Sequence, residues 1–251
     1  MDKNLNKTNN AINKDADEII SLPKVSICIP VYNRSKYLYE CINSALSQNY
    51  ENLELIIGDD NSDDETTLNI INGFLKNKRV RYYKNNENLG INRNYERLID
   101  FSEGEWLVLL SNDDYFTDNT FISQAIDRVK NIPNASVLCG GYRTITENEL
   151  GKVEERFDYT DGIFSGREFF LKGFDGFWPD FCICDMLMKK SAIRGTKLNS
   201  FIYSSPDFYF FMLLCLAGDV YVLSKPFLMY RYHDKNYSDC VSETDLYSKY
   251  S

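Results

Sequence analysis

The chain has 251 residues, of which 43% are hydrophobic and 26% charged, and its formal net charge is −9. This composition is typical of a globular protein, and the length suits one large α/β domain or two subdomains that share a core. The acidic charge argues against a protein that binds nucleic acid backbones, which needs clustered Lys and Arg. An acidic protein that handles nucleotides usually recruits a divalent cation.

The N-terminus and the cysteines bear on the cellular location. Met1–Leu22 is polar and has no signal-peptide core, so we interpret it as a mobile extension, or a short helix around Asp15–Ser21, outside the fold. No apolar run approaches the roughly 20 residues of a membrane span. We therefore expect a soluble, cytoplasmic protein, with peripheral association at the inner face of the membrane as an alternative. Free, buried thiols of a reducing cytosol are expected at Cys28, Cys139, Cys182, Cys184 and Cys215. The pair Cys182-x-Cys184 is too close and too isolated for a zinc site, which would need a second pair at ligand spacing, so we expect these cysteines to be structural.

Strands and helices alternate in the first half of the chain. This alternation is typical of parallel βαβ units, and it predicts an α/β fold. The predicted elements are a strand at Lys24–Pro30, a helix that Asn33 or Ser35 can cap and that ends near Gln48, a strand at Leu53–Ile57, a helix at Glu65–Lys76, and strands at Val80–Tyr83 and Glu105–Leu110.

The second half is less regular and is dense in aromatic residues. Trp178, in a predicted loop with Pro179 and Asp180, is a candidate platform for an acceptor sugar, and hydrophobic core is the alternative for most of its aromatic neighbours. The predicted elements are a helix near Asp118–Lys130, a strand at Ala135–Cys139, a helix from about Pro206 to Ala217, and a strand and loop at Val220–Tyr232.

Polar clusters follow three of the predicted strands, where ligands bind in open α/β sheets. Tyr32-Asn33 follows the first strand, Asp59-Asp60 the second, and Asn112-Asp113-Asp114 the strand at 105–110. Two adjacent carboxylates after a buried strand are costly unless a cation compensates them, and a divalent metal that carries a diphosphate would do so. The alternatives are that Asp114 or Asp118 caps the next helix, and that Asp59-Asp60 is an ordinary turn before a helix cap within 61–64.

Four motifs follow one another along the chain, and their order is stronger evidence than any one motif alone. They are Pro30-Val31-Tyr32-Asn33-Arg34, Asp59-Asp60-Asn61-Ser62 with Asp64, Asn88-Leu89-Gly90 with Arg93 and Asn94, and Asn112-Asp113-Asp114. This series closely resembles the nucleotide-binding half of the family 2 glycosyltransferases of the GT-A fold, over about Pro23 to Thr117.

The resemblance implies a nucleotide-diphospho-sugar donor and a divalent metal, Mn²⁺ or Mg²⁺. Asn112-Asp113-Asp114 stands where the family has its Asp-x-Asp motif, with Asn112 in the first place, which leaves Asp114 as the direct metal ligand and Asp113 as a ribose or metal contact. The donor-binding residues that the resemblance implies are Pro30, Val31, Tyr32 and Asn33 with Asp60 or Asp59 near the base, and Asn88, Gly90 and Arg93 near the ribose or diphosphate.

The stretch from Asn88 to Asn94 is shorter than the family's commonest version. It is similar to the subgroup that includes many rhamnosyl and other deoxysugar transferases. This departure leaves the base of the nucleotide open.

Two later residues match the family's catalytic centre. Asp207 opens a helix where the family's general base lies, although Pro206 stands where many members have Glu. A base there would take the proton of the acceptor hydroxyl in a single inverting displacement. His233, in Tyr230-Arg231-Tyr232-His233, resembles a late motif whose His can join the metal or close over the diphosphate, and an ordinary surface histidine is the alternative. Arg231 could bind phosphate or form a structural ion pair.

The resemblance implies one catalytic domain at 23–251, with a Rossmann-like, mostly parallel sheet. Residues 23–117 would bind the nucleotide sugar, and 118–251 would form an irregular acceptor half. The implied partner is a glycan or lipid-linked acceptor in surface polysaccharide, lipid-linked glycan or glycoprotein synthesis. One rival, a sugar nucleotidyltransferase, normally has a Gly-rich loop after its first strand, and residues 30–34 contain no glycine. A second rival is a non-enzymatic nucleotide- or sugar-binding module. Asp207 and Asp114 together argue against it, because a pure binding protein needs no base.

Overall fold

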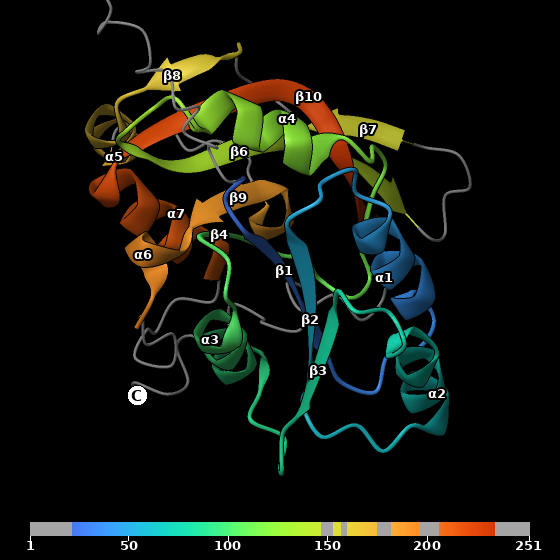
Figure 1. Ribbon diagram of the computed structural model, residues 1–251. Coiled ribbons are helices and arrows are strands. Elements are labelled where there is room, and N and C mark those ends of the chain that lie inside the picture. Colours follow the sequence, from blue (N-terminus) through green and yellow to red (C-terminus); the bar gives the residue numbers. More distant parts are fainter. Residues whose placement is uncertain (1–21, 147–152, 157–159, 175–181, 196–205, 234–251) are drawn as a thin grey trace, which may run out of the picture.

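The computed structural model describes residues 22–146, 153–156, 160–174, 182–195 and 206–233 (Figure 1). Within these ranges, ten strands form one mixed sheet in the order β3-β2-β1-β4-β9-β6-β10-β5, with β7 paired to β6 and β8 paired to β10. The predicted N-terminal helix, the loop with Trp178 and the segment before Pro206 lie outside the described residues.

The first half of the sheet is parallel. β1 pairs with β2 on one side and with β4 on the other, and β2 pairs with β3. The strand order thus reverses between β1 and β4, which is where open α/β sheets bind ligands. Figure 1 shows α1 and α2 on one face of these strands and α3 on the other. The elements are β1 (Val25–Val31), α1 (Leu38–Leu46), β2 (Leu53–Asp59), α2 (Glu65–Phe74), β3 (Val80–Lys84), α3 (Ile91–Phe101) and β4 (Trp106–Leu109).

The second half continues the same sheet through β9, which runs antiparallel between β4 and β6. β6 and β10 are long and parallel to each other, and they cross the top of the molecule in Figure 1. The elements are β5 (Tyr115–Phe116), α4 (Phe121–Val129), β6 (Ala135–Thr146), β7 (Val153–Arg156), β8 (Gly162–Phe164), α5 (Gly166–Phe174), the 3₁₀ turn η1 (Ile183–Asp185), β9 (Met186–Lys189), α6 (Lys190–Ile193), α7 (Pro206–Ala217) and β10 (Asp219–Tyr232).

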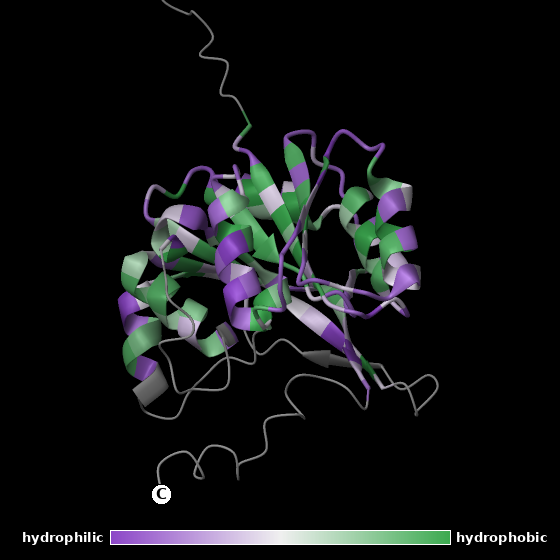
Figure 2. Cartoon of the chain, turned by 90° about the horizontal axis from the view of Figure 1, so that it is seen from below, coloured by the Kyte–Doolittle hydropathy of each residue, from purple (hydrophilic) through white to green (hydrophobic). Residues whose placement is uncertain are grey.

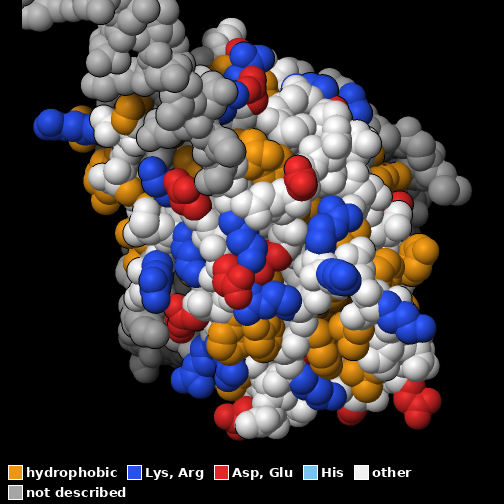
Figure 3. Space-filling model, viewed as in Figure 1, with side chains coloured by type: hydrophobic (Ala, Val, Ile, Leu, Met, Phe, Trp, Pro, Cys, Tyr) orange, Lys and Arg blue, Asp and Glu red, His pale blue; other side chains and the backbone are white. Residues whose placement is uncertain are grey.

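The core lies between the sheet and its helices. Every residue of β1, β2 and β4 is buried, as buried parallel strands require. Figure 2 shows these strands as hydrophobic and the outer helical faces as hydrophilic. On the face seen in Figure 3, basic and acidic side chains are interspersed. None of the helices in the described ranges combines the length and apolarity needed to cross a membrane.

The structure corrects two expected helix caps. α1 begins at Leu38 after Tyr37 without a side-chain cap, so neither Asn33 nor Ser35 caps it. Asp114 caps no helix either, because it is followed by β5, and α4 begins only at Phe121. The expected cap within 61–64 is correct: the carboxylate of Asp64 accepts the N–H groups of residues 66 and 67 at the start of α2.

The cysteines of the described part are free and buried, as expected for Cys28, Cys139, Cys182, Cys184 and Cys215.

Candidate active site

The loop after β1 is tied to the loops that follow its two neighbours in the sheet. The Asn33 side-chain oxygen accepts the N–H of Asp63 at 2.9 Å, and the Asn33 N–H donates to Ser62 Oγ at 3.0 Å. Arg34 reaches the loop after β4, where its guanidinium lies 2.5 Å from a carboxylate oxygen of Asp113. The structure therefore brings together the three strand ends that the sequence singles out.

Asp59 has a structural role within this edge. It is fully buried at the end of β2, and its two oxygens accept hydrogen bonds from the N–H of Ser62 at 2.7 Å and the hydroxyl of Tyr82 at 2.6 Å. These bonds shape the turn after β2. Asp59 thus behaves as the turn residue that the sequence left as one of two alternatives.

Asp60 organises the loop before α3. Its carboxylate accepts the Asn85 side-chain amide and the N–H groups of Leu89 and Gly90, each at 2.8 Å. Gly90 has a φ of +81°, a backbone conformation that favours glycine. The N–H of Gly90 also lies 2.9 Å from the side-chain oxygen of Asn88. The predicted residues Asp60, Asn88 and Gly90 therefore form one hydrogen-bonded unit.

The remaining donor-binding candidates surround that unit. Pro30 and Val31 are buried in β1, and the carbonyl of Val31 accepts the N–H of Asp60 at 2.8 Å. Tyr32 is 48% exposed at the end of the strand, and Arg93 is exposed on the first turn of α3. These positions leave both side chains accessible to a ligand beyond the strand ends.

The cluster after β4 is the most buried part of the site. Asn112, Asp113 and Asp114 are 8%, 7% and 1% exposed. Asp114 accepts the N–H of Arg231 at 3.0 Å on one oxygen and the thiol of Cys184 at 3.4 Å on the other. Both contacts come from the second half of the chain, so the metal candidate lies between the two halves.

Burial raises the pKa of Asp114 well above its usual value, and the negative charge of Asp113 raises it further. The N–H of Arg231, the thiol of Cys184 and the positive charge of Arg231 oppose this increase only in part. Further positive charge beside Asp114 would stabilise its charged form. A divalent cation would supply that charge, and carboxylate oxygens are suitable ligands for Mg²⁺ or Mn²⁺, so the residues fit the metal that the resemblance implies.

The end of β10 closes over this cluster. Arg231 donates from Nε to the carbonyl of Asp113 at 2.9 Å, forms an ion pair with Glu40, and lies over the rings of Tyr37 and Tyr115. The Arg231 side chain is thus held by protein groups on several sides, in line with the structural ion pair that the sequence left open.

His233 is not a plain surface residue. Its side chain is 7% exposed, and its Nε2 lies 3.0 Å from a carboxylate oxygen of Asp113. Its ring also stacks on Tyr37 with centroids 5.8 Å apart. The structure therefore pairs His233 with Asp113, the neighbour of the metal candidate Asp114.

Asp207, like Asp114, contacts the turn η1. It is partly buried in the first turn of α7, and its carboxylate accepts the N–H of Ile183 at 3.3 Å. Burial raises the pKa of Asp207, and this backbone hydrogen bond opposes the increase. A raised pKa suits a general base. Ile183 and Cys184 are consecutive, so one short turn contacts both acidic candidates.

Sequence reasoning missed the roles of Arg34 and Cys184. Arg34 stands inside a quoted motif, but its partner Asp113 is 79 residues away. The pair Cys182-x-Cys184 was visible in the sequence, and only the fold shows that its second thiol reaches Asp114.

Comparisons with known proteins agree with this geometry. A model of the family described as Glycosyl transferase family 2 matches residues 26–196. The GalNAc(5)-diNAcBac-PP-undecaprenol beta-1,3-glucosyltransferase of Campylobacter jejuni is 27% identical over 190 residues, which cover 73% of this chain and 57% of that protein. The chain spans only 20% to 57% of the length of the first curated relatives that it matches.

Two solved structures share the fold. S. aureus TarS 1-349 in complex with UDP-GlcNAc superposes with a TM-score of 0.68 at 22% identity, over 90% of this chain and 64% of that one. The mannosyltransferase PcManGT from Pyrobaculum calidifontis, in complex with GDP-Man and Mn²⁺, gives a TM-score of 0.60 at 11% identity, over 87% of this chain and 59% of that one. The predicted GT-A fold is confirmed.

Proposed function

Because the chain belongs to glycosyl transferase family 2, we propose that it is a metal-dependent, inverting glycosyltransferase that uses a nucleotide-diphospho-sugar. The observation that carries the proposal is the pair of acidic groups that contact consecutive residues of η1, the buried Asp114 and the partly buried Asp207. Asp114 lies at the point where the strand order reverses, and Asp207 approaches from α7. In an in-line displacement the base must reach the acceptor hydroxyl from the side opposite the leaving group, so it is expected to come from a different segment than the donor site.

Asp114 would hold the divalent cation, with Asp113 as a second oxygen ligand or a ribose contact. When bound, the cation neutralises the charge that grows on the departing diphosphate. Arg34 and His233, which now contact Asp113, are positioned to bind phosphate oxygens once Asp113 turns toward the ion.

The nucleotide would lie along the ends of β1 and β2. Tyr32 is exposed there and offers a ring for the base. Asp60 already accepts three hydrogen bonds, so a base N–H would have to share or replace one of them. Asn88, Gly90 and Arg93 would then contact the ribose or diphosphate, since they belong to or adjoin the same loop.

The substrates are proposed from the relatives. TarS binds UDP-GlcNAc, PcManGT binds GDP-Man, and the Campylobacter enzyme is named for a glucose transfer to an undecaprenol-linked glycan. We therefore expect a nucleoside-diphosphate hexose or deoxyhexose as donor and a glycan or lipid-linked acceptor in surface glycan synthesis. Association with the inner face of the membrane would follow from a lipid-linked acceptor.

The metal assignment is tested by calorimetry with Mn²⁺ and UDP or GDP. Asp114→Asn should abolish the Mn²⁺-dependent part of nucleotide binding, because it removes the charge that the cation requires. Asp127→Asn is the matched control, since Asp127 is exposed on α4 and pairs only with nearby basic side chains. Equal Mn²⁺-dependent affinity in Asp114→Asn and the wild type would refute the assignment.

The base assignment is tested by kinetics. Asp207→Asn should retain donor and metal binding, while turnover falls by roughly 10²- to 10⁴-fold, the usual contribution of general acid–base catalysis. NMR of the product should show the anomeric configuration opposite to that of the donor. Retained configuration, or near-normal turnover, would make Asp180 the next residue to test.

The rival activities give different products. A transferase with metal slowly releases nucleoside diphosphate from the sugar nucleotide in water, and a binding module releases none. A nucleotidyltransferase would form pyrophosphate from a nucleoside triphosphate and a sugar phosphate. Measuring nucleoside diphosphate and pyrophosphate on one sample separates the three classes.

A further inference from the structure

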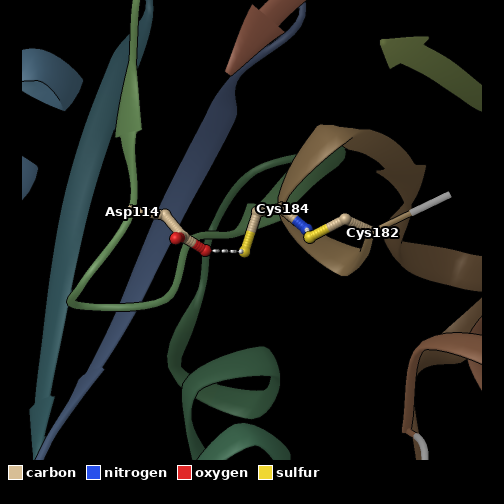
Figure 4. Close-up of side chains that lie close together, drawn as sticks. All are labelled: Asp114, Cys182 and Cys184. Atoms are coloured by element: carbon tan, nitrogen blue, oxygen red, sulfur yellow. Dashed lines mark hydrogen bonds between the residues drawn. The ribbon is translucent and has the colours of Figure 1, made fainter. Parts of the chain in front are cut away.

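Two thiols lie beside the proposed metal ligand, and the proposed reaction does not use them. The ligand atoms of Asp114, Cys182 and Cys184 all lie within 4.8 Å of one another, and all three residues are buried. Figure 4 shows the Asp114 carboxylate and the Cys184 thiol facing each other, with the thiol of Cys182, the N-cap residue of η1, beyond Cys184. Three potential ligand atoms from two segments thus lie close together.

The spacing matches the edge of a tetrahedral zinc site. Zn–S bonds of about 2.3 Å and Zn–O bonds of about 2.0 Å at a tetrahedral angle place the sulfur and oxygen about 3.5 Å apart. Cys184 Sγ lies 3.4 Å from Asp114 Oδ2. Asp114 therefore needs no large movement to share an ion with Cys184.

The local backbone holds the two thiols on the same side. The N–H of Cys184 lies 3.4 Å from the sulfur of Cys182 in the cap of η1, and Cys184 in turn accepts the N–H of Ser111 at 3.2 Å. The hydroxyl of Ser111 lies 3.3 Å from the sulfur of Cys184. This hydroxyl, or a water molecule, can complete a fourth position.

We propose that the donor-free protein binds a thiophilic divalent cation, Zn²⁺ or Cd²⁺, through Cys182 Sγ, Cys184 Sγ and Asp114 Oδ2. On binding, two S–H bonds break, two metal–sulfur bonds form, and two protons pass to solvent, with no change of oxidation state. Thiolate ligands favour such soft ions over Mg²⁺ and Mn²⁺, which prefer oxygen. The site is therefore distinct in its chemistry from the hard-cation site that carries the donor.

The two sites share Asp114, and this has a functional consequence that rests on the proposed function. An ion held by both thiolates occupies the oxygen that the donor's cation needs. Zn²⁺ should thus inhibit transfer in competition with Mn²⁺, and a chelator followed by fresh Mn²⁺ should restore activity.

Binding is tested without any donor, so its outcome does not depend on transferase activity. The reduced, full-length protein is titrated with Co²⁺, whose thiolate complexes absorb strongly in the near ultraviolet. We expect one Co²⁺ per chain, displaced by Zn²⁺. Cys182→Ser or Cys184→Ser should weaken binding by at least about 100-fold, since even the loss of an outer-shell partner costs about 10- to 100-fold.

Cys139→Ser and Cys215→Ser are the matched controls, because both replace buried thiols that belong to the core away from this cluster. They should leave the cobalt spectrum unchanged. NMR of Cd²⁺ bound to the wild type gives a readout that needs no substitution, because its chemical shift reports the number of sulfur ligands. A shift typical of oxygen ligands alone, or a cobalt band that survives in Cys182→Ser, would overturn the proposal.

Discussion

At the scale of single residues, burial changes the pKa of the proposed general base. Asp207 has a raised pKa because burial takes it out of water, and its carboxylate accepts the backbone N–H of Ile183. Asn offers an oxygen that can accept the same hydrogen bond. Substitution at this position therefore separates the charge of the side chain from its shape.

Removing the charge of Asp207 should also change the thermal stability of the fold. The folded protein holds the proton of Asp207 more tightly than the unfolded chain, so the charged form destabilises the fold once the pH rises above the unfolded pKa. Asp207→Asn should have a higher Tm than the wild type at pH 8. The difference should shrink as the pH falls through the raised pKa, and it should vanish below about pH 3.9, the unfolded value.

Thermal melts of both proteins between pH 3 and pH 8, with metal and donor absent, measure this difference. Asp127→Asn is again the control. The hydrogen bond from Lys130 lowers the pKa of Asp127, so removing this charge should lower the Tm at pH 8 instead of raising it. A Tm of Asp207→Asn below that of the wild type at pH 8 would contradict the account of burial.

At the scale of elements, the loop before α3 depends on one backbone conformation. Gly90 combines a φ of +81° with a ψ of 162°, a region almost restricted to glycine, and its N–H reaches Asp60. Gly90→Ala should reduce the free energy of unfolding by about 1–3 kcal/mol, although no atom blocks the added methyl group. It should also weaken nucleotide binding.

Urea unfolding measures the first effect, and Gly73→Ala is the matched control. Gly73 lies within α2 with open space around it and no positive φ. Alanine there should stabilise the protein by up to about 1 kcal/mol, because it is the better helix former. Equal effects of the two substitutions would show that the conformation of Gly90 is not strained for alanine.

The elements also show what sequence patterns can predict. The strands of the first half lie within about two residues of their predicted bounds, because each is a short apolar run with a polar end, and α2 does so too. α1 begins later than either expected cap allows. β6 was predicted to end before Gly140, yet it continues to Thr146. A side chain at Gly140 would lie 3.2 Å from the ring of Phe227, so the glycine permits close packing inside a continuing strand.

β10 was missed in part for a related reason. Ser224-Lys225-Pro226 has the composition of a loop, but the strand passes through it with register shifts on either side of Pro226. Such irregularities accommodate a proline within a sheet. η1 could not be predicted, because three residues carry no periodicity, and its importance comes from contacts with distant segments. The roles assigned to the site residues, including Asp114 and Asp207, stay predictions.

At the scale of the whole molecule, one buried carboxylate connects three strands of the parallel half and the segment before β4. Glu54 on β2 accepts the Ser26 hydroxyl of β1 at 2.6 Å, Arg81 of β3 at 2.8 Å, and the N–H of Glu103 before β4 at 2.7 Å. Burial alone would raise the pKa of Glu54, but these hydrogen bonds outweigh it and hold the pKa below its usual value.

Glu54→Gln should therefore destabilise the fold by about 2–3 kcal/mol at neutral pH, because it leaves Arg81 and Lys24 without their buried partner. A lowered pKa contributes stability above the unfolded value of about 4.3, and that stability is lost as the pH falls through the folded value. The difference in unfolding free energy from the wild type should therefore narrow in acid.

Chemical denaturation at pH 7 and at pH 3.5 measures this prediction. Glu103→Gln is the control, since Glu103 pairs with the same two cations but its side chain is 58% exposed. Its effect should stay below about 1 kcal/mol, as for other surface ion pairs. A Glu54→Gln protein as stable as the control at pH 7 would contradict the proposed role.

The three-residue turn η1 has a thermodynamic consequence. Its residue 183 holds Asp207 and its residue 184 holds Asp114, so a shift of this turn displaces both carboxyls together. A ligand that fixes the position of one carboxyl then changes the free energy needed to position the other. The donor and the acceptor would in this way influence each other's affinity, and by the same factor in both directions, as linkage requires. The order in which the two substrates arrive would then alter the path of assembly and leave the free energy of the ternary complex unchanged.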